Sequence, residues 1–346
     1  MLSYEEGSYF AKHFLEWINS EEFSQFISYL ADDIKIKISK NYHSVEPNIV
    51  KEIIDSFQVK SSLMSKLFRV KTFSAFIHGG MSKVSFSFDN DKLRRELGDM
   101  LFITTLRINR NFKLTKLSII QVKKTDRINR RIDINQGQLY LLSKFPKFSG
   151  VSGLFIGEFK FSNLSKNLGG YIIFNNIGDL IYTSAVLLRR ILYVSNSINY
   201  QKLHHELCDY SLLQTKFCIW KEPECFMTCL NKNNEKLIPV SVRNNLYSLC
   251  IYDFLKNLFS FSIGEIVQYR ELRFLKYLSE RMKVYSKSPK NKELQLFLQG
   301  TQEFFLNVNK TLSSYDDGNK NDNREELVDD SDSGMGVVYI EISYEY

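Results

Sequence analysis

Proline, glycine and cysteine are scarce in this chain of 346 residues, and long apolar runs are absent. The 5 Pro and 16 Gly exclude a collagen-like or linker-dominated chain. No run approaches the roughly 18 apolar residues of a membrane span, and the acidic start of the chain predicts no targeting segment. The five cysteines, all between Cys208 and Cys250, favour reduced thiols in an intracellular protein, cytoplasmic or nuclear.

Apolar and aromatic residues are plentiful. They make up 44% and 14% of the chain, enough for one large or two ordinary domains with a sizeable core. The net charge of +7 is unevenly distributed, because residues 315–346 hold ten acidic and two basic side chains and leave +15 on the rest. A basic body with a separate acidic tail indicates a polyanionic ligand such as nucleic acid.

The densest basic stretch lies within residues 107–131, where nine basic residues face one acid, Asp126. Such a field concentrates polyanions, and each phosphate contact releases counterions. A solvated surface face would produce the same run, so that alternative stays open. The residues predicted to contact phosphate are Arg107, Arg110, Lys113, Lys116, Lys123, Lys124, Arg127, Arg130 and Arg131.

A second candidate nucleic-acid contact surrounds Pro146, where bases and aromatics alternate. Lys144, Phe145, Lys147 and Phe148 are expected in a loop, where the rings would be exposed. Exposed aromatics beside cations stack on unpaired bases, which favours single-stranded ligands. Most of the 27 Phe must nevertheless fill the core.

The acidic tail divides into two parts. Residues 315–336 lack periodic apolar positions and are expected to be disordered, whereas residues 337–346 alternate like a strand. The tail would compete with polyanions for the basic surface or dock on a protein partner by adding a strand to its sheet. In the remaining alternative, the final strand completes the chain's own sheet.

The order of elements predicts an α+β fold. We expect two helices within residues 4–30, with Ser20 capping the second, then a strand over 34–38, a helix over 50–57 and strands over 67–78, 83–88, 100–108 and 112–122. Further on we expect strands over 139–142 and 153–161 and helices over 180–194, 201–213, 245–259, 263–284 and 293–309. The predicted domains are 1–122, cone-like α+β, and 137–314, mixed α/β, joined by a basic connector, 123–136, and followed by the tail, 315–346.

The first part of the chain resembles the nuclear-transport-factor-2-like superfamily, a group of cone-shaped α+β proteins. The resemblance is carried by residues 6–10 (EGSYF) and 13–14 (HF), by residues 29–34 (YLADDI), and by the long strands ending at residue 122. It implies helices packed on a curved antiparallel sheet, with Asp32 and Asp33 near the cone mouth. Members include enzymes, adaptors and dimerisation modules, so it implies little about activity.

Residues 153–161 indicate a catalytic site as an alternative to a function in binding alone. Glu158 and Lys160 are two apart on an expected strand and so share one face. With Asp133 upstream they resemble the site of PD-(D/E)XK nucleases, in which two carboxylates hold Mg²⁺ and the lysine activates water. The alternative is an exposed cross-strand ion pair.

A metal site is a weaker prediction. His204, Cys208, Cys225 and Cys229 offer nitrogen and sulfur donors within 26 residues, but without the paired CxxC spacing of a zinc site. Buried small side chains are the alternative. The phosphate-loop, GxSxG and HExxH motifs are absent.

Three functions remain in view from the sequence. The first is a non-catalytic nucleic-acid-binding protein that prefers single strands and uses no cofactor. The second is the Mg²⁺-dependent nuclease. The third is an adaptor whose N-terminal domain forms a homodimer.

Overall fold

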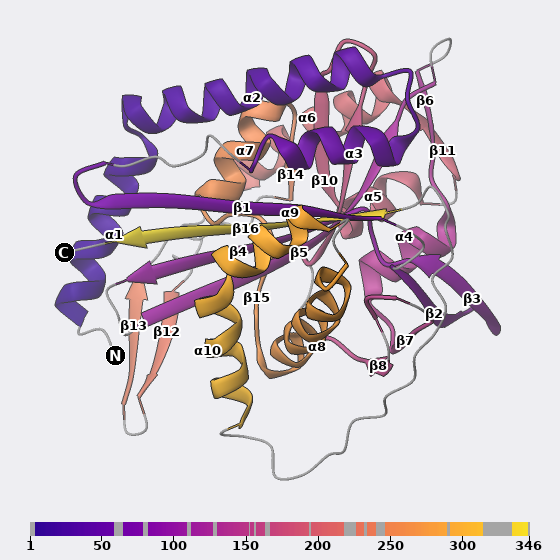
Figure 1. Ribbon diagram of the computed structural model, residues 1–346. Coiled ribbons are helices and arrows are strands. Elements are labelled where there is room, and N and C mark those ends of the chain that lie inside the picture. Colours follow the sequence, from indigo (N-terminus) through magenta and orange to yellow (C-terminus); the bar gives the residue numbers. More distant parts are fainter. Residues whose placement is uncertain are drawn as a thin grey trace.

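The computed structural model describes residues 4–58, 65–78, 82–108, 112–126, 130–151, 153–155, 157–162, 167–193, 195–217, 226–231, 234–239, 246–288, 291–313 and 334–344. Within these ranges the fold is α+β, as the order of elements predicts (Figure 1). The helices are α1 (Tyr4–Ile18), α2 (Glu21–Asn41), α3 (Glu46–Asp55), α4 (Gln136–Lys144), α5 (Ala185–Leu192), α6 (Tyr200–Phe217), α7 (Ile251–Phe259), α8 (Tyr269–Ser286), α9 (Lys292–Gly300) and α10 (Gln302–Ser313).

An eight-stranded mixed sheet lies at the centre, in the order β1-β16-β4-β5-β9-β10-β14, with β15 also paired to β5. Three smaller sheets have the orders β11-β6, β12-β13 and β3-β2-β7-β8. The strands are β1 (Phe68–His78), β2 (Lys83–Phe88), β3 (Asp91–Glu96), β4 (Met100–Ile108), β5 (Phe112–Lys124), β6 (Arg131–Asp133), β7 (Phe148–Gly150), β8 (Gly157–Phe159), β9 (Gly169–Phe174), β10 (Leu180–Ser184), β11 (Ser197–Asn199), β12 (Phe226–Asn231), β13 (Asn234–Pro239), β14 (Tyr247–Ser248), β15 (Glu265–Ile266) and β16 (Gly334–Tyr344).

Helices cover both faces of the central sheet (Figure 1). Buried residues of α1, α2, α3 and α7 form one core with one face of the sheet, and those of α4, α5, α8, α9 and α10 form a second core with the other face. A sheet covered on both sides has strands that are apolar throughout rather than alternating. The sequences of β9 (GGYIIF) and β10 (LIYTS), buried at every position, follow from this.

The strand predicted within the acidic tail is β16, and it lies inside the chain's own sheet. It pairs antiparallel with β1, from Phe68 opposite Tyr344 to His78 opposite Gly334, and parallel with β4. Ten of its 11 residues are buried. Gly336 passes so close to α3 that a Cβ atom there would stand 2.4 Å from Ile54. This arrangement corrects the expectation that the strand is free to join a partner's sheet.

The central sheet runs across the boundary predicted at residue 122. In that sheet β5 pairs with β4 on the N-terminal side of the boundary and with β9 on the other side. The strand contributed by the tail pairs with β1 and β4. The segments predicted as two domains and a tail therefore share one hydrogen-bonded sheet.

Two short segments predicted as strands are helical in the structure. The alternation of Ile34, Ile36 and Ile38 predicted a strand, but these residues continue α2 to Asn41 and only Ile34 and Ile38, four residues apart, are buried. Residues 139–142 form part of α4 because Asn135 Oδ1 accepts a hydrogen bond from the Gln138 N–H at 3.0 Å and caps a helix there. The predicted Ser20 cap of α2 is confirmed.

In the described part of the chain, no helix has the length and apolarity needed to cross a membrane.

Candidate functional site

The structure divides the basic stretch between the two faces of the central sheet. Successive side chains of a strand point to opposite faces, so Lys113 and Lys123 of β5 lie on one side and Lys116 and Lys124 on the other. Lys116 is buried, with 2% of its surface exposed, and its ammonium lies 5.3 Å from the centre of the Phe261 ring. Residues that are close in sequence therefore do not form one continuous cationic surface.

Most of the strand-borne cations also have acidic or carbonyl partners. Arg107 and Lys113 both contact the Glu303 carboxylate of α10, at 3.4 and 3.2 Å, and the hydrogen bond from Lys113 lowers the pKa of Glu303. Lys123 pairs with Glu46 at 2.8 Å, and the Lys124 ammonium donates to the Ser44 carbonyl at 2.9 Å. These contacts connect neighbouring segments to the sheet, and a phosphate would have to compete with them for the same cationic groups.

The C-terminal end of the basic stretch is different. Arg130 and Arg131 are both exposed at the start of β6, which forms a two-stranded ribbon with β11. Arg131 Nε donates to Asp133 Oδ1 at 3.2 Å on the same strand. Arg110 and Arg127 lie outside the described residues.

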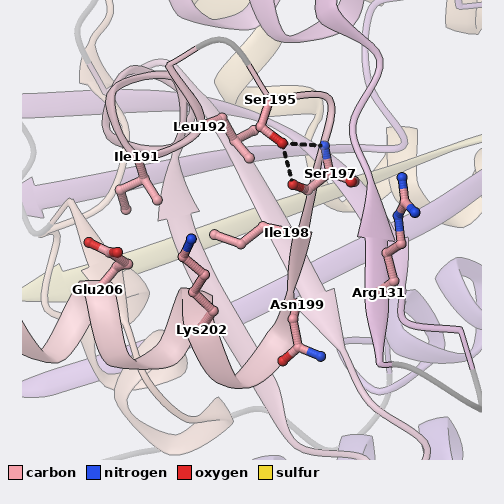
Figure 2. A pocket seen from close by; sticks show the side chains of 9 residues that line it. All are labelled: Arg131, Ile191, Leu192, Ser195, Ser197, Ile198, Asn199, Lys202 and Glu206. Carbon is pink, nitrogen blue, oxygen red and sulfur yellow. Dashed lines mark hydrogen bonds between the residues drawn. The ribbon is translucent and has the colours of Figure 1, made fainter.

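A pocket of about 390 Å³ opens where this ribbon meets α5 and α6 (Figure 2). It combines the cations of Arg131 and Lys202 with one acid, Glu206. We refer to it as the Arg131–Lys202 pocket. Its lining residues are Arg131, Ile191, Leu192, Ser195, Ser197, Ile198, Asn199, Lys202 and Glu206.

Local hydrogen bonds fix the wall of this pocket. The Ser195 hydroxyl donates to the Ser197 carbonyl at 2.7 Å and accepts from the Ser197 N–H at 3.3 Å, which closes the turn after α5. Asn199 Oδ1 accepts from the Gln201 N–H at 2.9 Å, at the start of α6. One turn further, Lys202 and Glu206 are four residues apart on the same helix face.

Arg131 is predicted from the sequence as a phosphate contact, whereas the other residues of the pocket are not. Lys202 and Glu206 have the helical spacing of an ordinary exposed face, which carries no signal of a site. Asn199 lies opposite Arg131 in the β6–β11 ribbon. This pairing depends on the tertiary fold and cannot be read from the spacing of residues in the sequence.

The aromatic rings of the expected stacking loop around Pro146 are not exposed. Phe145 ends α4 and Phe148 begins β7, and both rings are buried, each packed edge-on against Phe161. The Lys147 ammonium contacts Glu158 at 2.5 Å, and Lys144 is exposed. The aromatic residues belong to the core because β7 pairs with β2 and β8 beneath α8, so they are not available to stack on a base.

The three residues of the nuclease alternative lie on different parts of the fold. Asp133 is in β6 and pairs with Arg131, whereas Glu158 is in β8 of a separate sheet and pairs with Lys147. Lys160 follows β8 and is exposed. Among the described residues, no hydrogen bond or ion pair joins Asp133 to Glu158 or Lys160.

The weaker metal candidates are partly described. His204 Nδ1 lies 3.6 Å from Cys208 Sγ, one turn apart on α6. Cys225 is outside the described residues, as is the side chain of Cys229 in β12. Within the described residues, no three His, Cys, Asp or Glu side chains converge to hold a metal.

A buried carboxyl group lies where three central strands meet. Asp99 Oδ2 accepts hydrogen bonds from Gln121 Nε2 at 2.5 Å and from the Val122 N–H at 2.7 Å, and the Asp99 carbonyl accepts from the Gly336 N–H of β16 at 2.8 Å. Burial raises the pKa of Asp99 to about 7, although the bond from Val122 lowers it. Nothing in the sequence marks this aspartate, because its burial depends on strands far apart in the chain.

Fold and site together define an α+β protein with a two-sided mixed sheet and a small, partly cationic pocket on a peripheral ribbon. No protein-family model, no curated protein and no solved structure matches this chain. The resemblance of residues 4–122 to the cone-shaped superfamily therefore stays a prediction.

Proposed function

We propose that this protein binds nucleic acid and that the Arg131–Lys202 pocket holds a backbone phosphate. The observation that carries the proposal is that two cationic side chains from separate elements, β6 and α6, line one pocket, with Lys202 and Arg131 on either side of β11 (Figure 2). Arg131 belongs to the basic stretch that first indicated a polyanionic ligand. Lys202 has no ion pair among the described residues, in contrast to Lys113 and Lys123.

The chemistry of the pocket suits a phosphodiester. A lysine ammonium offers three donors, and the guanidinium of Arg131 keeps donors beyond the Nε–H that bonds Asp133. The volume of about 390 Å³ is within the range of small-ligand sites, enough for a phosphate with its sugar. Glu206 opposes the two cations and limits the affinity.

Reversing the charge of Lys202 tests this proposal. In Lys202→Glu, affinity for a labelled single-stranded oligonucleotide is expected to fall about tenfold or more, and the slope of log K against log salt to fall by about 1, because one phosphate contact is lost. Fluorescence anisotropy across a salt series measures both quantities.

Two further variants sharpen that experiment. Lys12→Glu changes the net charge equally on an exposed helix position of α1, which lies at the opposite end of the sheet from β6 and β11 (Figure 1), and is expected to have little effect. Glu206→Gln is expected to tighten binding. Equal losses in Lys202→Glu and Lys12→Glu would show a general charge effect and contradict a phosphate site at the pocket.

The acidic residues before β16 are proposed to compete with nucleic acid for the basic surface or to recruit a protein partner. Truncation is a poor test because it also removes β16. Neutralising Asp329, Asp330 and Asp332 to Asn keeps that strand. If the acids compete, affinity at low salt rises severalfold, as long-range attraction predicts. Unchanged affinity and salt slope in anisotropy would exclude competition.

A further inference from the structure

Tyr193 has an unusual surface position beside the Arg131–Lys202 pocket. It directly follows the lining residue Leu192 and precedes the lining residue Ser195 by two positions. With 87% of its surface exposed, it is the most exposed large hydrophobic residue among those described. An aromatic ring so exposed contributes little to folding.

The backbone of Tyr193 is also strained. It ends α5 with φ 45° and ψ −84°, and its N–H donates to the Arg189 carbonyl at 3.1 Å. This region of positive φ favours glycine, and bulky residues adopt it at a cost. Arg130, which directly precedes the lining residue Arg131, has φ 50°. Strained residues that persist without a packing reason tend to gather at binding sites.

We propose that Tyr193 is a stacking platform for an unpaired base whose phosphate lies in the Arg131–Lys202 pocket. The inference rests on the proposed function and narrows its ligand to single-stranded nucleic acid. The faces of paired bases are covered by their neighbours in a duplex, whereas an unpaired base can rotate onto an exposed ring. Arg131 and Lys202 bind the phosphate backbone of the nucleic acid, and the Tyr193 ring discriminates between single strands and duplex.

The test compares Tyr193→Ala and Tyr193→Phe with the unmodified protein, using a labelled single-stranded oligonucleotide and its duplex. Tyr193→Ala is expected to weaken single-strand binding about tenfold and to leave duplex binding unchanged, because stacking on one aromatic ring has about that effect. Tyr193→Phe keeps the ring and is expected to bind like the unmodified protein. Tyr29→Ala, at a half-exposed position of α2, is the surface control.

Tyr193→Gly separates binding from stability. Glycine relieves the backbone strain, so the melting temperature is expected to rise by about 1–2 °C while single-strand affinity falls as in Tyr193→Ala. If the Tyr193 variants bind normally while Lys202→Glu does not, the stacking inference is overturned and the phosphate site stands. Equal weakening on single strands and duplex would also overturn it. If the unmodified protein binds neither form at low salt, both proposals fail.

Discussion

Ile340→Asp is expected to abolish the stable fold. Ile340 is fully buried in the middle of β16, where it packs with the core formed by α1, α2, α3 and α7. An unpaired carboxylate there loses its hydration without gaining a partner, which adds to the lost apolar contacts and makes a cost of about 5 kcal/mol or more. Since ordinary domains have about 5–15 kcal/mol of stability, urea denaturation followed by circular dichroism should show little or no folded baseline.

An exposed position of the neighbouring strand supplies the control. Arg69→Asp introduces the same carboxylate on β1, where the side chain faces solvent, and its backbone carbonyl can still accept from the Ser343 hydroxyl. Its effect is expected to stay within about 1 kcal/mol. A cooperative transition in Ile340→Asp at the urea midpoint of the unmodified protein would contradict the central location of β16.

The second large effect is a dependence of stability on pH that originates at Asp99. The pKa of this carboxyl is about 7 in the folded protein against a reference value of 3.8, so between these pH values the folded state keeps a proton that the unfolded state has released. The stabilisation is present in full below about pH 4 and is lost as pH rises through about 7. The free energy of unfolding should fall by about 1.4 kcal/mol per pH unit in this window, or about 4 kcal/mol in total.

Asp99→Asn removes the titration while keeping an oxygen that accepts from Gln121 and Val122. Relative to this variant, the unmodified protein should lose about 4 kcal/mol between pH 4 and pH 8 in urea-unfolding experiments. Asp133→Asn, the same substitution at an exposed position paired with Arg131, is the matched surface control. Parallel profiles for the unmodified protein and Asp99→Asn would show that this carboxyl is already ionised at low pH in the folded state.

The sequence predicts local elements well where the local signals agree. The strands predicted over 100–108 and 112–122 are confirmed, and they pair antiparallel in the structure; the helix start at Ser20 is also confirmed. The pattern fails at Ile34, Ile36 and Ile38 because a run alternating in twos also places residues i and i+4 on one helix face. The helix forms because Ile34 and Ile38 continue the buried face of α2 into the hydrophobic core.

Strand order is the part of the fold that local patterns do not contain. The insertion of β16 between β1 and β4 depends on pairing between residues separated by most of the chain. The alternation at residues 337–346 predicted a strand with two unlike faces, whereas buried cores cover both faces of β16. The pattern identifies a strand, but its neighbours are set by tertiary packing.

In the candidate site too, the sequence shows the composition but not the tertiary arrangement of the residues. The basic composition of residues 107–131 is plain in the sequence, yet strand alternation sends Lys113 and Lys116 to opposite faces and buries the latter. Arg131 remains exposed because it lies on the short ribbon outside the central sheet. Tyr193 went unnoticed because its exposure results from a strained helix end within an apolar segment.

The place of β16 in the sheet also determines the order in which the fold can be completed during synthesis. β1 and β4 are made early, but the strand that separates them is made only after the whole of β5 to α10. During that interval the facing edges of β1 and β4 have no partner, and open apolar edges are the surfaces at which nascent chains associate wrongly. We therefore expect the newly made protein to depend on chaperones that shield strand edges until translation has passed residue 344.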